Sequence, residues 1–289
     1  MRKLYFFFLF IFSSTTITAQ LNADFTADST KGCGSIAGVN FTDQSTGNPT
    51  SWLWDFGNNN TSTLQNPVAN YTAPGKYTVR LTVSNASSSD VITKTNFIVV
   101  YSRPQANYTY NPTSGCAPLL VSFTNTSTIG DTSIQRFIWD FGDGDKSGIG
   151  NPNHVYQIGG SFPASLQVID RNGCSNFITK PTINVTTPPL ANFTTAGRIV
   201  SCDDSLTVNF INTSQGNNLT YKWYFGDGDS SNQANPIHQY RGFGRYDVTL
   251  ITADPNCSDT LFFSEHIRLE NTKALISLPK KEFYWSQYL

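Results

Sequence analysis

The sequence predicts an all-β protein built from three similar sandwiches in tandem, and two observations support this prediction. The first is a seven-residue phrase, WDFGDGD from Trp139, that recurs as WYFGDGD from Trp223 and as WDFGNNN from Trp54. These tryptophans are 85 and 84 residues apart, and a fixed period of this kind marks tandem copies of one structural unit. The second is that apolar and polar residues alternate between clusters of Gly, Pro, Asn and Ser, which is typical of strands joined by turns.

Within each copy the alternation indicates short strands. In the first copy we expect strands at 23–26, 39–42, 51–56, 77–83 and 97–100. Tyr77, Val79 and Leu81 fall at every second position and therefore lie on one face of a strand. In the second copy the matching strand carries Phe162, Ala164, Leu166 and Val168 inward. Pro163 points the other way, which suits an edge position because proline lacks a backbone N–H. No stretch has helical periodicity. Each repeat unit is about 80 to 85 residues long, which is close to the size of a small antiparallel sandwich.

The repeat period predicts domains at 20–101, 104–186 and 190–270. The linkers between them are short and contain proline, so we expect semi-rigid spacers and an elongated array. Ala274 continues the series of alanines that open the copies, which predicts that 274–289 is the truncated start of a fourth repeat. The alternative is a C-terminal tail.

The N-terminus is typical of a secretory signal peptide, which we place at residues 1–19. Arg2 and Lys3 precede an apolar run that ends at Phe12. This run is shorter than the roughly 20 residues of a membrane helix, so we expect no membrane span in the mature chain. The alternative is a buried N-terminal strand. A net charge of −1 offers no basic surface for nucleic acid, and the sequence predicts a secreted or cell-surface protein.

The five cysteines fall into register with the repeat, and a secreted chain favours disulfides. Cys116 and Cys174 belong to the second copy, and Cys202 and Cys257 to the third. We therefore expect two bridges within repeats, Cys116–Cys174 and Cys202–Cys257. Cys33 would stay unpaired, because Ser88 stands where its partner would be. The alternative, a metal site, lacks the close ligand spacing that zinc requires.

The aromatic residues of the phrase are interpreted as core. A Trp and a Phe two positions apart lie on one face of a strand and supply a large buried area. A Tyr recurs at a fixed distance after each pair. The structural motif thus comprises Trp54, Phe56, Tyr71, Trp139, Phe141, Tyr156, Trp223, Phe225 and Tyr240. The alternative is a stacking platform for sugars.

The acidic part of the phrase allows two interpretations. Its glycines supply positive φ and its aspartates bond local backbone in a hairpin loop. The alternative is a calcium site formed by Asp143 with Asp145 and by Asp227 with Asp229, whose oxygens alternate as in calcium loops. No glutamate follows at calcium-loop spacing, and the first copy has Asn58-Asn59-Asn60 instead.

The histidines and the remaining residues give no sign of catalysis. His154 and His238 share one repeat position with Ala69, which favours a surface role on a strand over a metal site. No catalytic or nucleotide-binding motif occurs, so we expect no enzyme, no catalytic residue and no cofactor other than the calcium alternative.

The phrase, the Asn-Pro pair at Asn151, Tyr156 and the run from Gly160 to Val168 together resemble the PKD (polycystic kidney disease) domain. The three copies in register cover about 250 residues. The resemblance implies immunoglobulin-like sandwiches outside the cell, as in secreted proteins of Bacteroidota. It also implies non-catalytic modules that act as spacers or adhesion regions, or lie beside catalytic domains of secreted hydrolases. Tyr224 departs from the pattern, where the family has Asp.

We therefore expect a non-catalytic extracellular array that acts as a spacer or adhesion region and contacts an extracellular protein or polysaccharide. One alternative is the accessory region of a secreted hydrolase whose catalytic domain lies beyond residue 289. Another is a carbohydrate-binding array that uses exposed tyrosine and tryptophan side chains.

Overall fold

The computed structural model describes residues 20–271. The predicted signal peptide at 1–19 and the predicted fourth repeat at 274–289 lie outside the described residues. Between residues 20 and 271 all regular structure is β, so this range contains no helix that could cross a membrane.

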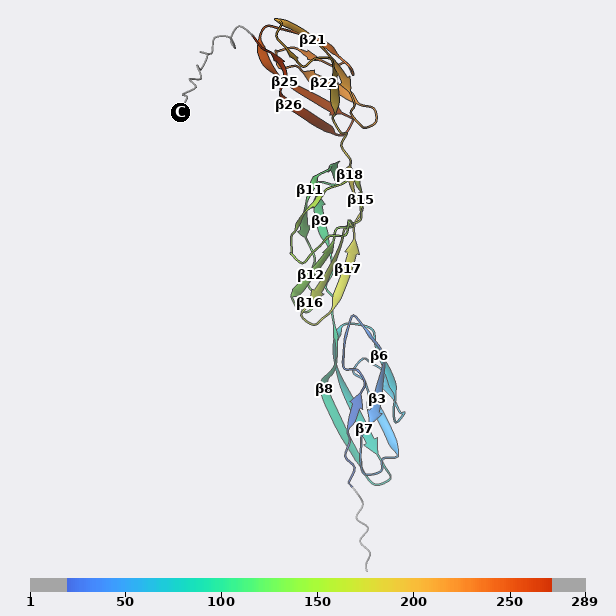
Figure 1. Cartoon of the computed structure of the whole chain (residues 1–289). Helices are drawn as coiled ribbons and strands as arrows, with labels where there is room; N and C mark the ends of the chain where they lie inside the picture. The colour runs from blue at the N-terminus through green and yellow to red at the C-terminus, as the bar shows by residue number, and fades with distance from the viewer. Residues whose placement is uncertain (1–19, 272–289) are drawn as a thin grey trace, which may run out of the picture. The chain divides into compact units, whose positions relative to one another are not determined.

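The strands follow the repeat period (Figure 1). The first repeat contains β1 (Phe25–Ala27), β2 (Lys31–Cys33), β3 (Ile36–Asp43), β4 (Ser51–Asp55), β5 (Thr61–Ser62), β6 (Val68–Tyr71), β7 (Gly75–Ser84) and β8 (Ser89–Tyr101). The second contains β9 (Tyr108–Asn111), β10 (Ser114–Cys116), β11 (Leu119–Asn125), β12 (Ile134–Asp140), β13 (Lys146–Ser147), β14 (Asn153–Tyr156), β15 (Gly160–Phe162), β16 (Ser165–Asp170), β17 (Ser175–Thr179) and β18 (Ile183–Thr186). The third contains β19 (Phe193–Ala196), β20 (Val200–Ser201), β21 (Ser205–Asn212), β22 (Thr220–Tyr224), β23 (Ser230–Ser231), β24 (Ile237–Arg241), β25 (Gly244–Ala253) and β26 (Ser258–Leu269).

The first and third repeats have the same two sheets. In the first, β1-β3-β6 forms one sheet and β2-β8-β7-β4-β5 the other. In the third, β19-β21-β24 and β20-β26-β25-β22-β23 repeat this order. All the pairings are antiparallel except that β2 and β20 run parallel to the last strand of their repeat. The predicted fold class, all-β with tandem immunoglobulin-like sandwiches, is confirmed.

The second repeat differs because prolines interrupt its two longest strands. The counterpart of β7 is divided into β15 and β16 around Pro163, and the counterpart of β8 into β17 and β18 around Pro181. A proline has no N–H to donate to a neighbouring strand, so the ladder stops there. The larger sheet accordingly becomes two, β10-β18-β15 and β13-β12-β16-β17. Pro163 therefore lies in a break between two strands rather than on an edge strand.

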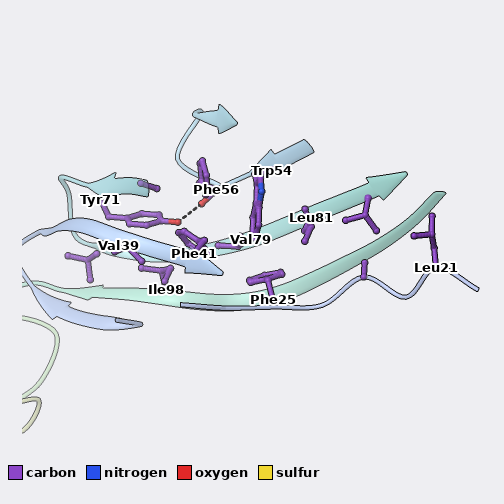
Figure 2. Packing of buried hydrophobic residues seen from close by; sticks show 14 residues of the cluster. Leu21, Phe25, Val39, Phe41, Trp54, Phe56, Tyr71, Val79, Leu81 and Ile98 are labelled. Atoms are coloured by element: carbon purple, nitrogen blue, oxygen red, sulfur yellow. Dashed lines mark hydrogen bonds between the residues drawn. The ribbon is translucent and has the colours of Figure 1, made fainter. Parts of the chain in front are cut away.

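The core of each repeat contains the side chains that alternate inward from both sheets. In the first repeat, Figure 2 shows Phe25 and Phe41 from one sheet against Trp54 and Leu81 from the other. The rings of Phe25 and Trp54 meet edge to face with centroids 5.2 Å apart, a favourable geometry for aromatic pairs. The strand expected at 97–100 is the last part of the longer strand β8, which begins at Ser89.

Backbone contacts divide the chain into two compact units, and the division runs through the second repeat. The first unit contains the described residues up to Asn107 together with Thr126–Ile138 and Leu166–Ile178. The second unit contains Tyr108–Asn125, Trp139–Ser165 and the described residues from Thr179 onward. Each unit thus combines one complete sandwich with part of the second repeat.

Candidate functional site

The motif aromatics lie in the cores. Trp54, Trp139 and Trp223 are 0% exposed, and each indole Nε1–H donates to the backbone carbonyl ten residues later, at 2.8–2.9 Å. The phenylalanines and tyrosines of the motif are also buried: Phe56, Phe141, Phe225, Tyr71, Tyr156 and Tyr240. Burial leaves no face of these rings free to stack on a sugar, so the platform alternative loses its support at the motif residues.

The acidic turn follows directly after the buried Trp-x-Phe segment. In the second repeat Gly142 and Gly144 have φ of 85° and 105°, a region that glycine adopts without strain. A Cβ on Gly142 would lie 2.9 Å from Pro163, so the turn also requires the absence of a side chain there. The backbone N–H of Asp145 donates to Asp143 Oδ1 at 3.2 Å. The turn therefore positions the second carboxylate oxygen of Asp143 for another partner.

That partner is a histidine from a neighbouring strand. His154 on β14 stacks on Phe141 with ring centroids 4.1 Å apart and an interplanar angle of 3°. Its Nε2 lies 2.6 Å from Asp143 Oδ2. A carboxylate can only accept, so Nε2 carries the hydrogen and donates it. The His154 side chain is 9% exposed.

The third repeat contains the same arrangement. His238 stacks on Phe225 at 4.1 Å, and its Nε2 lies 2.7 Å from Asp227 Oδ2. The two histidines lie on strands as predicted, but their rings are mostly covered, with side chains 9% and 10% exposed, because stacking and a charge-assisted hydrogen bond hold them against the core. The signal was present in the sequence, since the His and the Asp eleven residues earlier occur together in two repeats and are both absent from the first.

The first repeat closes the same turn with amides. Asn58 stands at the position of Asp143, and Ala69 at that of His154. The Asn58 side chain donates to the backbone carbonyl of Asn70 at 2.8 Å and accepts from the N–H of Asn60 at 3.1 Å. The turn thus keeps its shape without a charge and without a histidine.

The acidic turns also define the candidate metal sites. Asp143, Asp145 and His154 each offer one ligand atom, and these atoms lie within 4.8 Å of one another; Asp227, Asp229 and His238 form an equal set. Calcium prefers six to eight oxygen ligands, so an imidazole nitrogen fits a transition metal better. The Nε2 atom of His154 would also have to lose the hydrogen that it donates to Asp143 before it could bind a metal ion. A calorimetric titration tests the calcium alternative at Asp143, Asp145, Asp227 and Asp229, and no heat of binding would rule it out.

The cysteines pair between repeats, which corrects the predicted pairing within repeats. Cys33 bonds to Cys174, and Cys116 bonds to Cys257. Both bridges span 141 residues, and in each case both cysteines lie in one compact unit. Cys202 carries the free thiol, not Cys33. The Cα atoms of the bonded pairs are 5.5 and 5.8 Å apart, within the range of about 4.4–6.8 Å that a disulfide requires.

Short local motifs hold the second cysteine of each bridge. Asp170 Oδ1 accepts from the N–H of Cys174 at 2.9 Å, and Asp254 Oδ1 accepts from the N–H of Cys257 at 2.7 Å. Both aspartates sit at the start of the turn between two paired strands. Asx turns of this kind fix the backbone of a hairpin loop, so each cysteine is presented from a rigid turn.

An arginine of the linker reinforces the first bridge. Arg103 donates from one guanidinium nitrogen to the carbonyl of Cys33 at 3.1 Å and from the other to the carbonyl of Ser175 at 3.3 Å. The backbone N–H of Ser102 donates to Asp131 at 2.8 Å. The linker residues Ser102 and Arg103 thus form hydrogen bonds with the first repeat, at Cys33, and with the second, at Asp131 and Ser175. These polar contacts surround the first bridge.

These features define a class of protein: a tandem array of immunoglobulin-like modules in which consecutive modules are joined by disulfides. The PKD domain family matches residues 18–100, 101–185 and 186–261, and the chain belongs to that family. The resemblance seen in the sequence is confirmed by this family match.

Known proteins with PKD domains are similar to parts of this chain. The chain is 32% identical over 148 residues to the pre-pro-metalloprotease PrtV of Vibrio cholerae, a match that covers 50% of this chain and 16% of that protein. The crystal structure of the PKD1 domain from that metalloprotease is 33% identical and covers 29% of this chain and 99% of its own, with a TM-score of 0.27. The PKD1 domain of Vibrio anguillarum Epp is 32% identical and covers 30% and 99%, with a TM-score of 0.27.

Proposed function

We propose that the three PKD repeats form a non-catalytic extracellular spacer whose consecutive modules are locked together by disulfides. The observation behind this proposal is the pair of bridges, Cys33–Cys174 and Cys116–Cys257. Disulfides persist in oxidising compartments and are rare in the cytosol, so the bridges favour a location outside the cell.

The bridges matter because a peptide linker alone leaves neighbouring modules free to move. Modules joined only by a short linker behave like weakly associated domains, and relative motion is the default. A second covalent connection between the same two modules removes most of that freedom. A spacer benefits from this restriction, since it must hold whatever it carries at a fixed distance from its anchor.

Solution scattering tests the spacer. We would compare the oxidised chain with the double variant Cys33→Ser, Cys174→Ser, which removes one bridge and leaves no new thiol. The variant should give a broader distribution of dimensions, and reduction of the wild type, which breaks both bridges, should broaden it further. Cys202→Ser is the matched control, since it removes a thiol but no bridge. Identical scattering from all three oxidised proteins would contradict the proposal.

A second candidate function is favoured by the relatives. The chain is similar to part of a metalloprotease of Vibrio cholerae, and this similarity supports a role as the accessory region of a secreted hydrolase. An antibody against the third repeat would isolate the native species from medium and cell surface. A hydrolase domain on the same polypeptide would establish the accessory role, and a species of PKD repeats alone would exclude it.

Adhesion requires a ligand, and we propose an extracellular protein or polysaccharide. The described surface offers exposed aromatic side chains outside the motif, among them Tyr224 at 47% and Phe177 at 61%. Binding of the whole chain to a glycan array and to immobilised matrix proteins tests this function. The absence of any binding on both surfaces would leave the spacer as the function of these repeats.

A further inference from the structure

We infer that Cys202 is one half of a third bridge between repeats, whose other half is the second cysteine of a further PKD repeat. The two observed bridges follow one rule: the first cysteine of a repeat bonds to the second cysteine of the next repeat. Cys202 is the first cysteine of the third repeat and has no partner in this chain, because the other four cysteines are all paired.

The rule has a structural basis in the position of the first cysteine. Cys33 ends β2, which pairs in parallel with β8 so that Cys33 lies opposite Tyr101. Cys116 ends β10, which pairs in parallel with β18 so that Cys116 lies opposite Thr186. Tyr101 and Thr186 are the last strand residues of their repeats. The first cysteine therefore lies beside the point where the chain leaves one repeat and enters the next.

Cys202 occupies this same position in the third repeat. It follows β20 directly, and β20 pairs in parallel with β26 so that Ser201 lies opposite Leu269. The N–H of Glu270 donates to the carbonyl of Ser201 at 2.8 Å. The thiol is exposed next to the exit strand. Two cysteines placed in this way both form bridges, and this independent observation assigns the same role to the third.

The first repeat has a first cysteine, Cys33, but no second cysteine. Asn85 opens its hairpin loop as Asp170 and Asp254 do, and accepts from the N–H of Ser88 at 3.0 Å. Ser88 thus stands in the turn position that holds a cysteine in the second and third repeats. Within this sequence no cysteine precedes Cys33, and the first repeat has Ser88 in place of a second cysteine.

The partner is therefore a PKD repeat with a cysteine in the turn that begins with Asp or Asn. Such a repeat could follow in the same polypeptide, 141 residues after Cys202 if the spacing is kept, or belong to another molecule. The chemistry is the same in both cases. A second copy of this chain does not qualify, because its Cys174 and Cys257 are already bonded.

Bridge formation requires an oxidant, which we take to be a protein disulfide of a thiol oxidoreductase. One of the two thiolates attacks a sulfur of that disulfide and displaces the other sulfur as a thiolate, giving a mixed disulfide. The second thiolate then attacks the cysteine sulfur and releases the oxidoreductase in its dithiol form. Two thiols lose two electrons and two protons in total, and one disulfide is reduced.

Peptide mapping of the native protein without reduction tests the inference. Free thiols are alkylated before unfolding, and the digest is sequenced by mass spectrometry. We expect Cys202 in a crosslinked peptide whose partner carries the Asp- or Asn-initiated turn. Alkylated Cys202, a Cys202–Cys202 crosslink or a small-molecule cap would each overturn the inference. Non-reducing electrophoresis separates the two sources, since only a partner on another molecule adds mass that a reductant releases.

A chimaera provides an independent test. Residues 1–270 are followed directly by a copy of residues 102–186 in which the copied Cys116 is changed to Ser, and this join restores the separation of 141 residues from Cys202 to the copied Cys174. Maleimide should label the original chain at Cys202 and should leave the chimaera unlabelled. Changing the copied Cys174 to Ser should restore the labelling. Persistent labelling of the chimaera at Cys202 would contradict the inference.

Discussion

The first and second repeats share the buried half of the repeated phrase and differ in its exposed half. Trp54 and Trp139 are equally buried and donate equivalent hydrogen bonds from their indole nitrogens. After the following phenylalanine, the first repeat continues with amides and the second with carboxylates. The comparison separates what every repeat needs in order to fold from what only two of them contain.

The exposed half changes as a unit. Where Asp143 is replaced by Asn58, His154 is replaced by Ala69, so donor and acceptor are lost together. A buried histidine without its acceptor would leave a polar group unsatisfied, which costs about 1–3 kcal/mol. The pair therefore behaves as one structural device, added to a sandwich that folds without it.

The largest loss of stability should come from replacing a tryptophan in the buried half of the phrase, which the repeats share. Replacing Trp139 by Ala removes a fully buried indole and should destabilise the second repeat by about 3–5 kcal/mol. The same replacement at Trp54 should cost the first repeat a similar amount. Native-state hydrogen exchange, which resolves local stability, measures both.

Trp139→Phe is the control for this comparison. It keeps most of the ring volume but removes the hydrogen bond from Nε1 to the carbonyl of Ile149. We expect a smaller loss than for alanine. If alanine destabilised one repeat strongly and the other hardly at all, the tryptophans would not have equivalent roles.

The sequence was sufficient to predict the shared half for a simple physical reason. Alternation places Trp54 and Phe56 on one face of a strand, and large aromatic side chains on such a face are buried in a small sandwich. The missing N–H of Pro163 predicts a position off the central ladder, although the structure has a break between β15 and β16 where an edge position was expected. These features depend on residues that are close in sequence.

The exposed half and the bridges could not be derived in this way, because they depend on residues that are distant in sequence. His154 reaches Asp143 only because β14 lies over the turn, so the pair is visible in the sequence only as a shared absence from the first repeat. Register alone cannot tell whether Cys116 bonds within its repeat or to Cys257 in the next, since both choices leave one thiol over. Three-dimensional proximity decides between them.

The next largest effect concerns the His–Asp pair. His154→Ala should destabilise the second repeat by about 2 kcal/mol, because it removes a stacked ring and a hydrogen bond to a charged group. Native-state hydrogen exchange of the amides in the second repeat measures this loss. His238→Ala should have the same effect on the third repeat.

The reverse substitution in the first repeat sharpens the comparison. Asn58→Asp with Ala69→His installs the pair, and the double variant should be more stable than the sum of its single variants by about 1 kcal/mol. A double-mutant cycle with no coupling energy would show that the turn and the histidine act independently.

A smaller effect distinguishes the motif tyrosines. The Tyr156 hydroxyl donates to the carbonyl of Phe141 at 2.9 Å, whereas the buried Tyr240 hydroxyl has no hydrogen-bond partner among the described residues. Burial raises the pKa of both phenols. Tyr156→Phe should cost the second repeat about 1 kcal/mol, and Tyr240→Phe should be neutral or stabilising in the third. Equal losses in thermal unfolding would indicate that Tyr240 makes an equivalent bond in solution.

The smallest effect is a pH dependence that separates the first and third repeats. His266 packs edge to face on Phe193, where the first repeat packs Phe97 on Phe25. Burial lowers the pKa of His266 below its usual value of about 6.5, so the unfolded chain binds the proton more readily than the folded one. The free energy of unfolding of the third repeat should therefore fall as pH decreases below about 6.5, by less than about 1.4 kcal/mol per pH unit. Hydrogen exchange at pH 7 and pH 5.5 measures this change, and His266→Phe should remove it; a dependence that survives the substitution would have to arise from another group.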